Sequence, residues 1–140
     1  MALKMTHEDL QAFVKEVFPQ VAEDFTVMEV APMAITVRLN VGERHLRPGG
    51  TISGPSMFGL ADVAIYLAIM AMVGPKALAV TTNSSMDFMR KPAAGVDLIA
   101  KCQLLKLGRV LAVGDVLLFS EGMADPVARA SMTYSIPPKG

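Results

Sequence analysis

The apolar residues near the N-terminus recur every three to four positions, which is the spacing of one face of a helix. They are Leu10, Phe13, Val14, Val17 and Phe18. Thr6 precedes this stripe and stands three positions before the carboxylate of Asp9, a spacing that matches a capping box at a helix start. We therefore expect a short amphipathic helix that ends near Pro19.

Much of the remaining chain follows the twofold period of β-strands. Residues 33–41 alternate between apolar and polar side chains, and residues 25–31 form a segment that is placed to pair with them. The stretch that follows them is rich in glycine and arginine and has no period, so we expect a loop there. Four further strands are expected after residue 77, with turns at Gly108 and at residues 122–126. They span residues 78–89, 96–107, 109–120 and 126–136.

Residues 55–73 form the longest apolar run of the chain. Pro55 suits the first turn of a helix and Gly74-Pro75 suits its end, so we expect one helix almost 30 Å long, at about 1.5 Å per residue. Because this helix is apolar on every face, a flat sheet packed on one side would leave half of it in water. An antiparallel sheet curled around the helix covers most of it, and a second copy of the chain covers the remainder.

These elements predict an α+β fold of the hotdog type in a single domain over residues 1–140. A curled antiparallel sheet of six strands wraps around one long central helix, and a short helix precedes them. The same reasoning predicts a homodimer and leaves a dimer of dimers open. The alternative for residues 55–73 is a transmembrane helix. Asp62 would then cost at least about 2.5 kcal/mol near the bilayer centre, and amphipathic strands flank the helix, so we expect no membrane partner.

Composition and charge narrow the classes of partner. Thirteen basic and thirteen acidic side chains balance, so the chain lacks the positive field that a nucleic-acid partner needs. Cys102 is the only cysteine and no signal peptide is recognisable, so we expect a cytoplasmic protein without an intrachain disulfide. His7 and His45 have no ligand-like spacing to a carboxylate, and we assign no metal. The apolar content of 52% is high for a small monomer and favours a subunit interface.

Asp62 is the one charged residue inside the long apolar helix, and its position needs a reason. Taken alone, it is explained equally well by a structural pair with a nearby strand. However, Ser53-Gly54-Pro55 begins the same helix, where free backbone N–H groups and the helix dipole can stabilise an oxyanion. An oxyanion site together with a carboxylate that acts as a base or a nucleophile is typical of acyl transfer.

Two motifs, together with the order of elements, carry a resemblance that covers nearly the whole chain. The GG-x-x-SGP-x-x-x-x-LAD run of residues 49–62 and the TTNSSMDFMRKP segment of residues 81–92 resemble the hotdog-fold acyl-CoA thioesterases of the phenylacetate-pathway type. In that family the helix starts with His-Gly-Gly, and a catalytic aspartate lies eight residues after the first glycine. Gly54 and Asp62 keep this interval, whereas Ser53 and Pro55 replace the histidine and the second glycine. The resemblance therefore implies that Gly54 is the oxyanion donor and Asp62 the catalytic carboxylate.

The resemblance also implies further site residues. In relatives a Ser or Thr on the strand after the helix, supplied by the opposite subunit, orients the substrate or water, and the matching residue here is Thr81. Asn83 is expected on the same face of that strand. Basic residues can contact the phosphates of coenzyme A, and Phe58 can line an acyl tunnel with several methionines. The substrate-binding candidates are Arg47, Asn83, Arg90, Lys91, Ser53 and Phe58.

We therefore expect an enzyme that hydrolyses an acyl-CoA to the free acid and CoA, with no cofactor apart from the CoA of the substrate. Two alternatives stay open. A hotdog 3-hydroxyacyl-thioester dehydratase would use His45 with a carboxylate, although the spacing from His45 to Asp62 does not match that pattern. A non-catalytic acyl-CoA binding module would keep the fold without the chemistry, and Ser53 in place of the usual histidine is consistent with it. The sequence leaves the acyl group undetermined.

Overall fold

The helices and strands follow the predicted order in the computed structural model, which describes residues 2–76 and 78–138. The bounds of the long helix and the later strands differ from the expected ones by one or two residues, and two short 3₁₀ helices are added. The elements are α1 (His7–Val17), η1 (Ala22–Asp24), β1 (Phe25–Ala31), β2 (Ala34–Leu39), η2 (Glu43–His45), α2 (Gly54–Val73), β3 (Val80–Phe88), β4 (Leu98–Leu107), β5 (Leu111–Ser120) and β6 (Pro126–Ser135).

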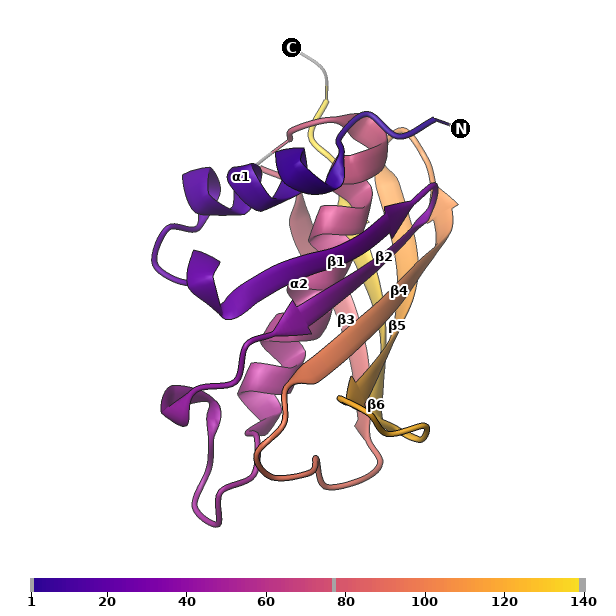
Figure 1. Cartoon of the computed structure of the whole chain (residues 1–140). Coiled ribbons are helices and arrows are strands. Elements are labelled where there is room, and N and C mark those ends of the chain that lie inside the picture. Colours follow the sequence, from indigo (N-terminus) through magenta and orange to yellow (C-terminus); the bar gives the residue numbers. More distant parts are fainter. Residues whose placement is uncertain (1, 77, 139–140) are drawn as a thin grey trace.

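The six strands form one antiparallel sheet that curls around α2, as predicted (Figure 1). The strand order is β1-β2-β4-β5-β6-β3, so the connection that carries α2 places β3 at the edge opposite β1. The register shifts once in four of the five strand pairs, all except β2 with β4. Such β-bulges bend a strand and increase its twist, which explains how the sheet curls.

The helix α2 begins and ends at the expected signals. Ser53 is its N-cap, Pro55 lies in the first turn, and Gly74, with a φ of 89°, ends it. By length and composition α2 could cross a membrane, but 67% of its apolar window is buried inside the fold, as in a core helix. On β5, Gly114 lets the sheet approach α2, since a Cβ there would lie 3.1 Å from Leu104 and 3.5 Å from Ile65.

The predicted capping box starts α1. The Thr6 N–H donates to Asp9 Oδ2 at 2.9 Å, and the Asp9 N–H donates to Thr6 Oγ1 at 3.1 Å. The apolar stripe of α1 packs against β1 and the C-terminal half of α2 (Figure 1). Phe13 and Phe18 bring their rings to within 6.1 Å and 5.5 Å of the Tyr66 ring on α2. This aromatic cluster lies beside the site described below.

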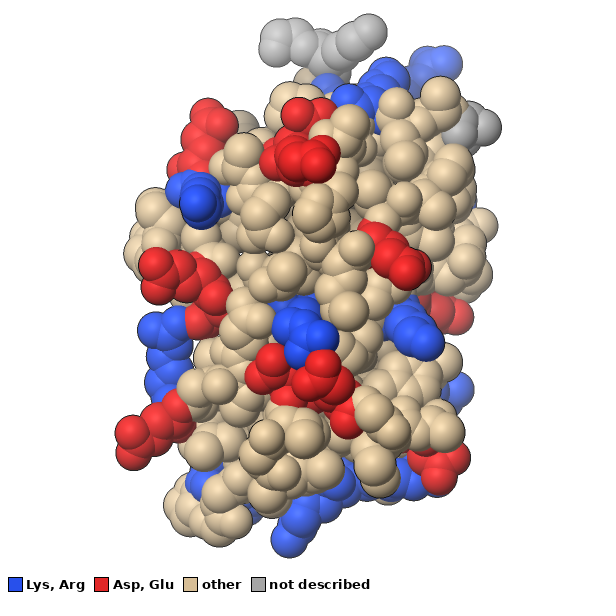
Figure 2. All heavy atoms as spheres, in the orientation of Figure 1, with Lys and Arg blue, Asp and Glu red and all other residues tan. Residues whose placement is uncertain are grey.

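Several large apolar side chains are exposed along β3, the residues flanking it and the first turns of α2. We call this region the β3 face, and its exposed apolar side chains are Phe58, Leu78, Val80, Phe88 and Met89. Within the described residues β3 pairs only with β6, so its outer edge has unpaired backbone groups. In contrast, acidic and basic side chains are interspersed over the face seen in Figure 2, in keeping with the balanced charge.

Candidate functional site

Asp62 is held by hydroxyl groups from two neighbouring strands. Its Oδ1 atom accepts a hydrogen bond from Thr81 Oγ1 at 2.6 Å and another from the Tyr134 hydroxyl at 2.7 Å. The Tyr134 hydroxyl also lies 3.2 Å from the main-chain oxygen of Asp62. Such short distances are typical of hydroxyls that donate to an ionised carboxylate. Asp62 is only half-buried, so its hydrogen bonds to the strands leave part of the residue accessible to solvent.

A cavity of about 400 Å³ lies beside Asp62. Most of its wall is apolar or aromatic, and the lining residues are Phe18, Asp62, Val63, Tyr66, Ala79, Val80, Thr81 and Tyr134. Among the described residues, no donor reaches Asp62 Oδ2. A carboxylate with one oxygen held and the other free beside a cavity can take a proton from water or attack an electrophilic carbon.

Thr81 and Tyr134 are directly opposite each other in the β3–β6 pair. Opposed residues share a face of the sheet, and here it is the face toward α2, because both hydroxyls reach Asp62. The register shifts after Thr81, so that Asn83 is opposite Thr133. The prediction that Asn83 shares a face with Thr81 is therefore wrong, because the bulge turns Asn83 to the exposed outer face.

The Thr81 hydroxyl contacts Asp62 of its own chain. Strand order explains this contact, because β3 follows α2 directly and pairs with β6, which places the start of β3 against the same helix. The expectation that the partner's Thr81 orients substrate or water stays a prediction.

Tyr134 is the site residue that the sequence pattern did not indicate. It is 3% exposed, and its ring centroid lies 6.1 Å from that of Tyr66. Burial, and then the negative charge of Asp62, raises the pKa of Tyr134 well above its usual range, so the phenol stays a neutral donor. One signal could have found it: Tyr134 occupies an inward position of the last strand, and a buried tyrosine hydroxyl needs a partner.

At the start of α2 the Gly54 N–H is the available backbone donor. Ser53 Oγ accepts from the Ser56 N–H at 3.3 Å, and the Met57 N–H donates to the Ser53 carbonyl at 3.1 Å. Pro55 has no N–H. The Gly54 N–H has no partner among the described residues. It therefore remains able to stabilise an oxyanion, whereas the hydroxyl of Ser53, predicted to bind substrate, acts as a helix cap.

The two predicted catalytic groups are far apart within one chain. Gly54 and Asp62 are eight residues apart on one helix, which corresponds to a rise of about 12 Å. The Asp62 side chain tilts toward the N-terminus of the helix, but this shortens the distance to Gly54 only in part. An oxyanion donor and an attacking group must both lie about 3 Å from the same carbonyl. The interpretation that one helix serves one carbonyl with both groups is therefore wrong for a single chain.

The basic candidates lie at the end of the molecule where α2 begins, in the loops before α2 and after β3 (Figure 1), and basic side chains gather along this lower edge in Figure 2. Arg47 and Lys91 are exposed, and neither side chain has a partner among the described residues. The Arg90 guanidinium donates to the Pro126 carbonyl at 2.6 Å. The structure does not bring Arg47 into contact with Asp62.

His45 has a structural role. Its Nδ1 accepts the Gly42 N–H at 2.8 Å, and its Nε2 lies 3.3 Å from Asp24 Oδ2, while Arg44 pairs with the other oxygen of Asp24. Burial, and then the charge of Arg44, lowers the pKa of His45, so the ring is neutral. Both ring nitrogens are engaged and the side chain is buried. This arrangement disfavours the dehydratase alternative, which needs a histidine that faces the substrate.

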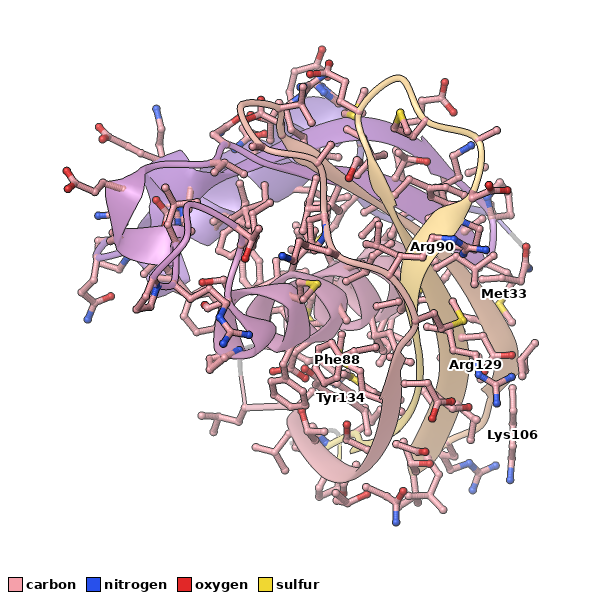
Figure 3. The ribbon with its side chains drawn as sticks, turned by 90° about the horizontal axis from the view of Figure 1, so that it is seen from below. Met33, Phe88, Arg90, Lys106, Arg129 and Tyr134 are labelled. Atoms are coloured by element: carbon pink, nitrogen blue, oxygen red, sulfur yellow. The ribbon has the colours of Figure 1, made fainter. Side chains whose placement is uncertain are left out.

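Phe58 is 38% exposed on the first turns of α2, and the Phe88 ring lies 3.5 Å from the position that a Cβ of Gly54 would occupy. In the view from below, Phe88 and Tyr134 lie beside α2 (Figure 3). In contrast, Met57, Met70 and Met72 are buried in the core and do not line an open tunnel. The described residues contain no cluster of three His, Cys, Asp or Glu side chains that could bind a metal.

Known proteins of similar sequence and structure include thioesterases. A model of the thioesterase superfamily matches residues 49–127. The solved structure of a candidate thioesterase from Silicibacter sp. TM1040 is 62% identical, covers 99% of this chain and 96% of that chain, and has a TM-score of 0.93. A mutant form of the phenylacetic acid degradation protein PaaI from Thermus thermophilus is 31% identical over 85% of this chain and 99% of that chain, with a TM-score of 0.73.

A thioesterase from mouse is also similar to this chain in sequence. Acyl-coenzyme A thioesterase 13 from Mus musculus is 25% identical over 116 residues, which are 83% of this chain and 82% of the mouse protein. These similarities confirm the predicted hotdog fold and the prediction of a thioesterase. Since the family model matches more than half of the residues, this chain belongs to the thioesterase superfamily.

Proposed function

We propose that this enzyme hydrolyses an acyl-CoA thioester to the free acid and CoA, at a site that combines Asp62 of one subunit with the partner's Gly54. The observation that carries the proposal is the Asp62 carboxylate, which is held at Oδ1 and free at Oδ2 beside a cavity. The unpaired N–H of Gly54 supports an oxyanion site. The name of the mouse relative, an acyl-coenzyme A thioesterase, supports the class of substrate.

The reaction needs a group that activates the nucleophile and one that stabilises the developing charge. Asp62 takes a proton from water while the water oxygen attacks the thioester carbon, or it attacks that carbon itself. The Gly54 N–H donates to the carbonyl oxygen as this oxygen gains negative charge. When Asp62 acts as a base, the C–S bond then breaks, and the sulfur takes the proton from Asp62 and leaves as the CoA thiol. In the covalent route, the C–S bond breaks as the acyl-aspartate anhydride forms, and CoA leaves as a thiolate. A water molecule then hydrolyses the anhydride, which releases the acid, restores Asp62 and supplies the proton that the thiolate takes up.

A homodimer resolves the separation of about 12 Å between Gly54 and Asp62. When two α2 helices pack antiparallel about a twofold axis, each Gly54 approaches the Asp62 of the other copy, and two equivalent sites form. The β3 face supports this assembly. Pairing of β3 with the partner's β3 satisfies the free backbone groups of its edge and buries exposed side chains such as Val80 and Phe88.

The basic residues near the start of α2 fit the charge of coenzyme A. Arg47 and Lys91 are exposed and lack partners among the described residues, so their charges are available to the phosphates of the substrate. Arg90 anchors the loop through its bond to Pro126 and adds positive charge to the same rim. Phe58 lies one turn into α2, where it can contact the thioester end of the substrate.

The test is the release of free thiol from a panel of acyl-CoAs with straight, branched and aromatic acyl groups. We expect turnover by the wild type and a loss of about 10²- to 10⁴-fold in Asp62→Asn, with the dimer intact by light scattering. Full turnover by an intact Asp62→Asn dimer would contradict the proposal. Tight acyl-CoA binding by the wild type without thiol release from any substrate would instead favour the binding module.

A further inference from the structure

We infer that Tyr134 is a positioning residue of this reaction: together with Thr81 it holds Oδ1 of Asp62, so that Oδ2 is the oxygen that reacts. The inference rests on the proposed function, because it assigns a role in that reaction to a residue that neither the sequence motifs nor the resemblance includes. It starts from two hydrogen bonds, of 2.6 Å from Thr81 and 2.7 Å from Tyr134, that end on the same carboxylate oxygen.

The acceptor capacity of the carboxylate decides which oxygen is free. A carboxylate oxygen has two lone pairs that accept hydrogen bonds. Both are used at Oδ1, by two hydroxyls that can only donate to it while it is unprotonated. A proton taken from water must therefore go to Oδ2, which has no donor among the described residues and belongs to a residue that lines the cavity.

The two donors are also rigidly placed with respect to each other. Thr81 and Tyr134 are opposite one another in the β3–β6 pair, so the sheet itself sets the spacing of their side chains. The Tyr134 ring packs beside Tyr66, which Phe13 and Phe18 contact in turn. The Tyr134 ring is buried, so its hydroxyl stays in place. Rotation of the Asp62 carboxylate about the Cβ–Cγ bond would therefore break both hydrogen bonds.

The environment of Tyr134 suits it to hold a charge and not to exchange a proton. Burial and the nearby negative charge raise its pKa, so the phenol does not compete with Asp62 as a base. Its hydroxyl therefore donates to Oδ1 without exchanging a proton with it. Removal of the hydroxyl should leave the carboxylate less well aimed.

The test compares Tyr134→Phe and Thr81→Val with the wild type in thiol release from the best acyl-CoA of the panel. Tyr134→Phe removes one oxygen atom and keeps the ring. The matched control is Ser131→Ala, which removes from β6 another hydroxyl that donates to a carboxylate at 2.6 Å, that of Asp115 on the outer face of the sheet. Melting temperature and dimer mass are measured for each variant.

For Tyr134→Phe we expect kcat to fall about tenfold or more, equivalent to about 1.4 kcal/mol, with KM within about twofold of the wild type. Thr81→Val should act in the same direction, and the double variant should lose less than the product of the two single losses, because both donors share one oxygen. Ser131→Ala should keep the kcat of the wild type.

The outcomes separate this inference from the proposed function. If the wild type releases thiol and Asp62→Asn does not, but folded Tyr134→Phe keeps the kcat of the wild type, the positioning role alone is refuted. Equal losses of kcat in Tyr134→Phe and Ser131→Ala would refute it too, since that pattern indicates a structural effect. If the wild type releases no thiol from any acyl-CoA, the proposed function fails and this inference fails with it.

Discussion

Two inactive variants of this chain should restore activity when they assemble with each other. The first is Asp62→Asn, which removes the carboxylate. The second is Gly54→Pro, which removes the only unpaired N–H described at the start of α2. Ser53 suits a following proline, because it is extended with a ψ of 154°, and a Cβ at Gly54 would lie 3.5 Å from Phe88, an ordinary contact.

The expected magnitude follows from the separation of Gly54 and Asp62. Each variant alone should lose at least about 10²-fold in kcat, the usual effect of removing an oxyanion donor or a catalytic base. If each site combines groups from two chains, a mixed dimer has one site with both groups intact and one site with neither. Random assembly makes about half of the dimers mixed, so the mixture should regain about a quarter of the wild-type activity per chain.

The assay is thiol release by mixed dimers, isolated by co-expressing the two variants with different affinity tags and purifying on both. A doubly purified dimer should have about half of the wild-type activity, since one of its two sites is intact. Gly54→Ala, which keeps the N–H, separates loss of the donor from loss of the glycine and should lose far less than Gly54→Pro. Mixed dimers as inactive as their parents would refute the shared site.

Three further predictions concern stability. Leu67→Ala, at a fully buried position of α2, should lower the free energy of unfolding by about 2–5 kcal/mol in urea titrations, whereas Leu105→Ala, at a position 60% exposed, should change it little. Ser53→Ala should cost about 1 kcal/mol through the lost cap and leave KM unchanged; a raised KM would indicate substrate binding. The lowered pKa of His45 means that the unfolded chain binds its proton first, so stability should fall as the pH drops below about 6.5, and His45→Gln should flatten this fall.

The secondary structure could be predicted because its signals are local. The capping box of Thr6 and Asp9, Pro55 in the first turn of α2 and the twofold alternation of β2 each act within a few residues, and each is found in the structure. The strand order could not be predicted in this way. The pairing of β3 with β6 joins residues about fifty positions apart, and it depends on how the sheet closes around the helix.

The candidate site also contains residues that local signals indicate and residues that depend on distant contacts. Gly54 and Asp62 stand out in the sequence, since one begins a helix and the other is a charge inside an apolar run. The face of Asn83 was predicted wrongly because a bulge after Thr81 breaks the alternation of inward and outward side chains. The residue types in that segment do not indicate a bulge. Tyr134 was missed because its role exists only through a contact with Asp62, 72 positions away.

The amino-acid sequence is enough to predict the elements of this protein and to single out Gly54 and Asp62 as candidates, because helix caps, periodicity and a charge within an apolar run are properties of neighbouring residues. Tertiary packing determines which atoms meet. It placed the Thr81 and Tyr134 hydroxyls on one oxygen of Asp62 and left Gly54 too far from that carboxylate to act within one chain. Such distances depend on strand order and register, which arise only when segments remote in the sequence pack around a shared core.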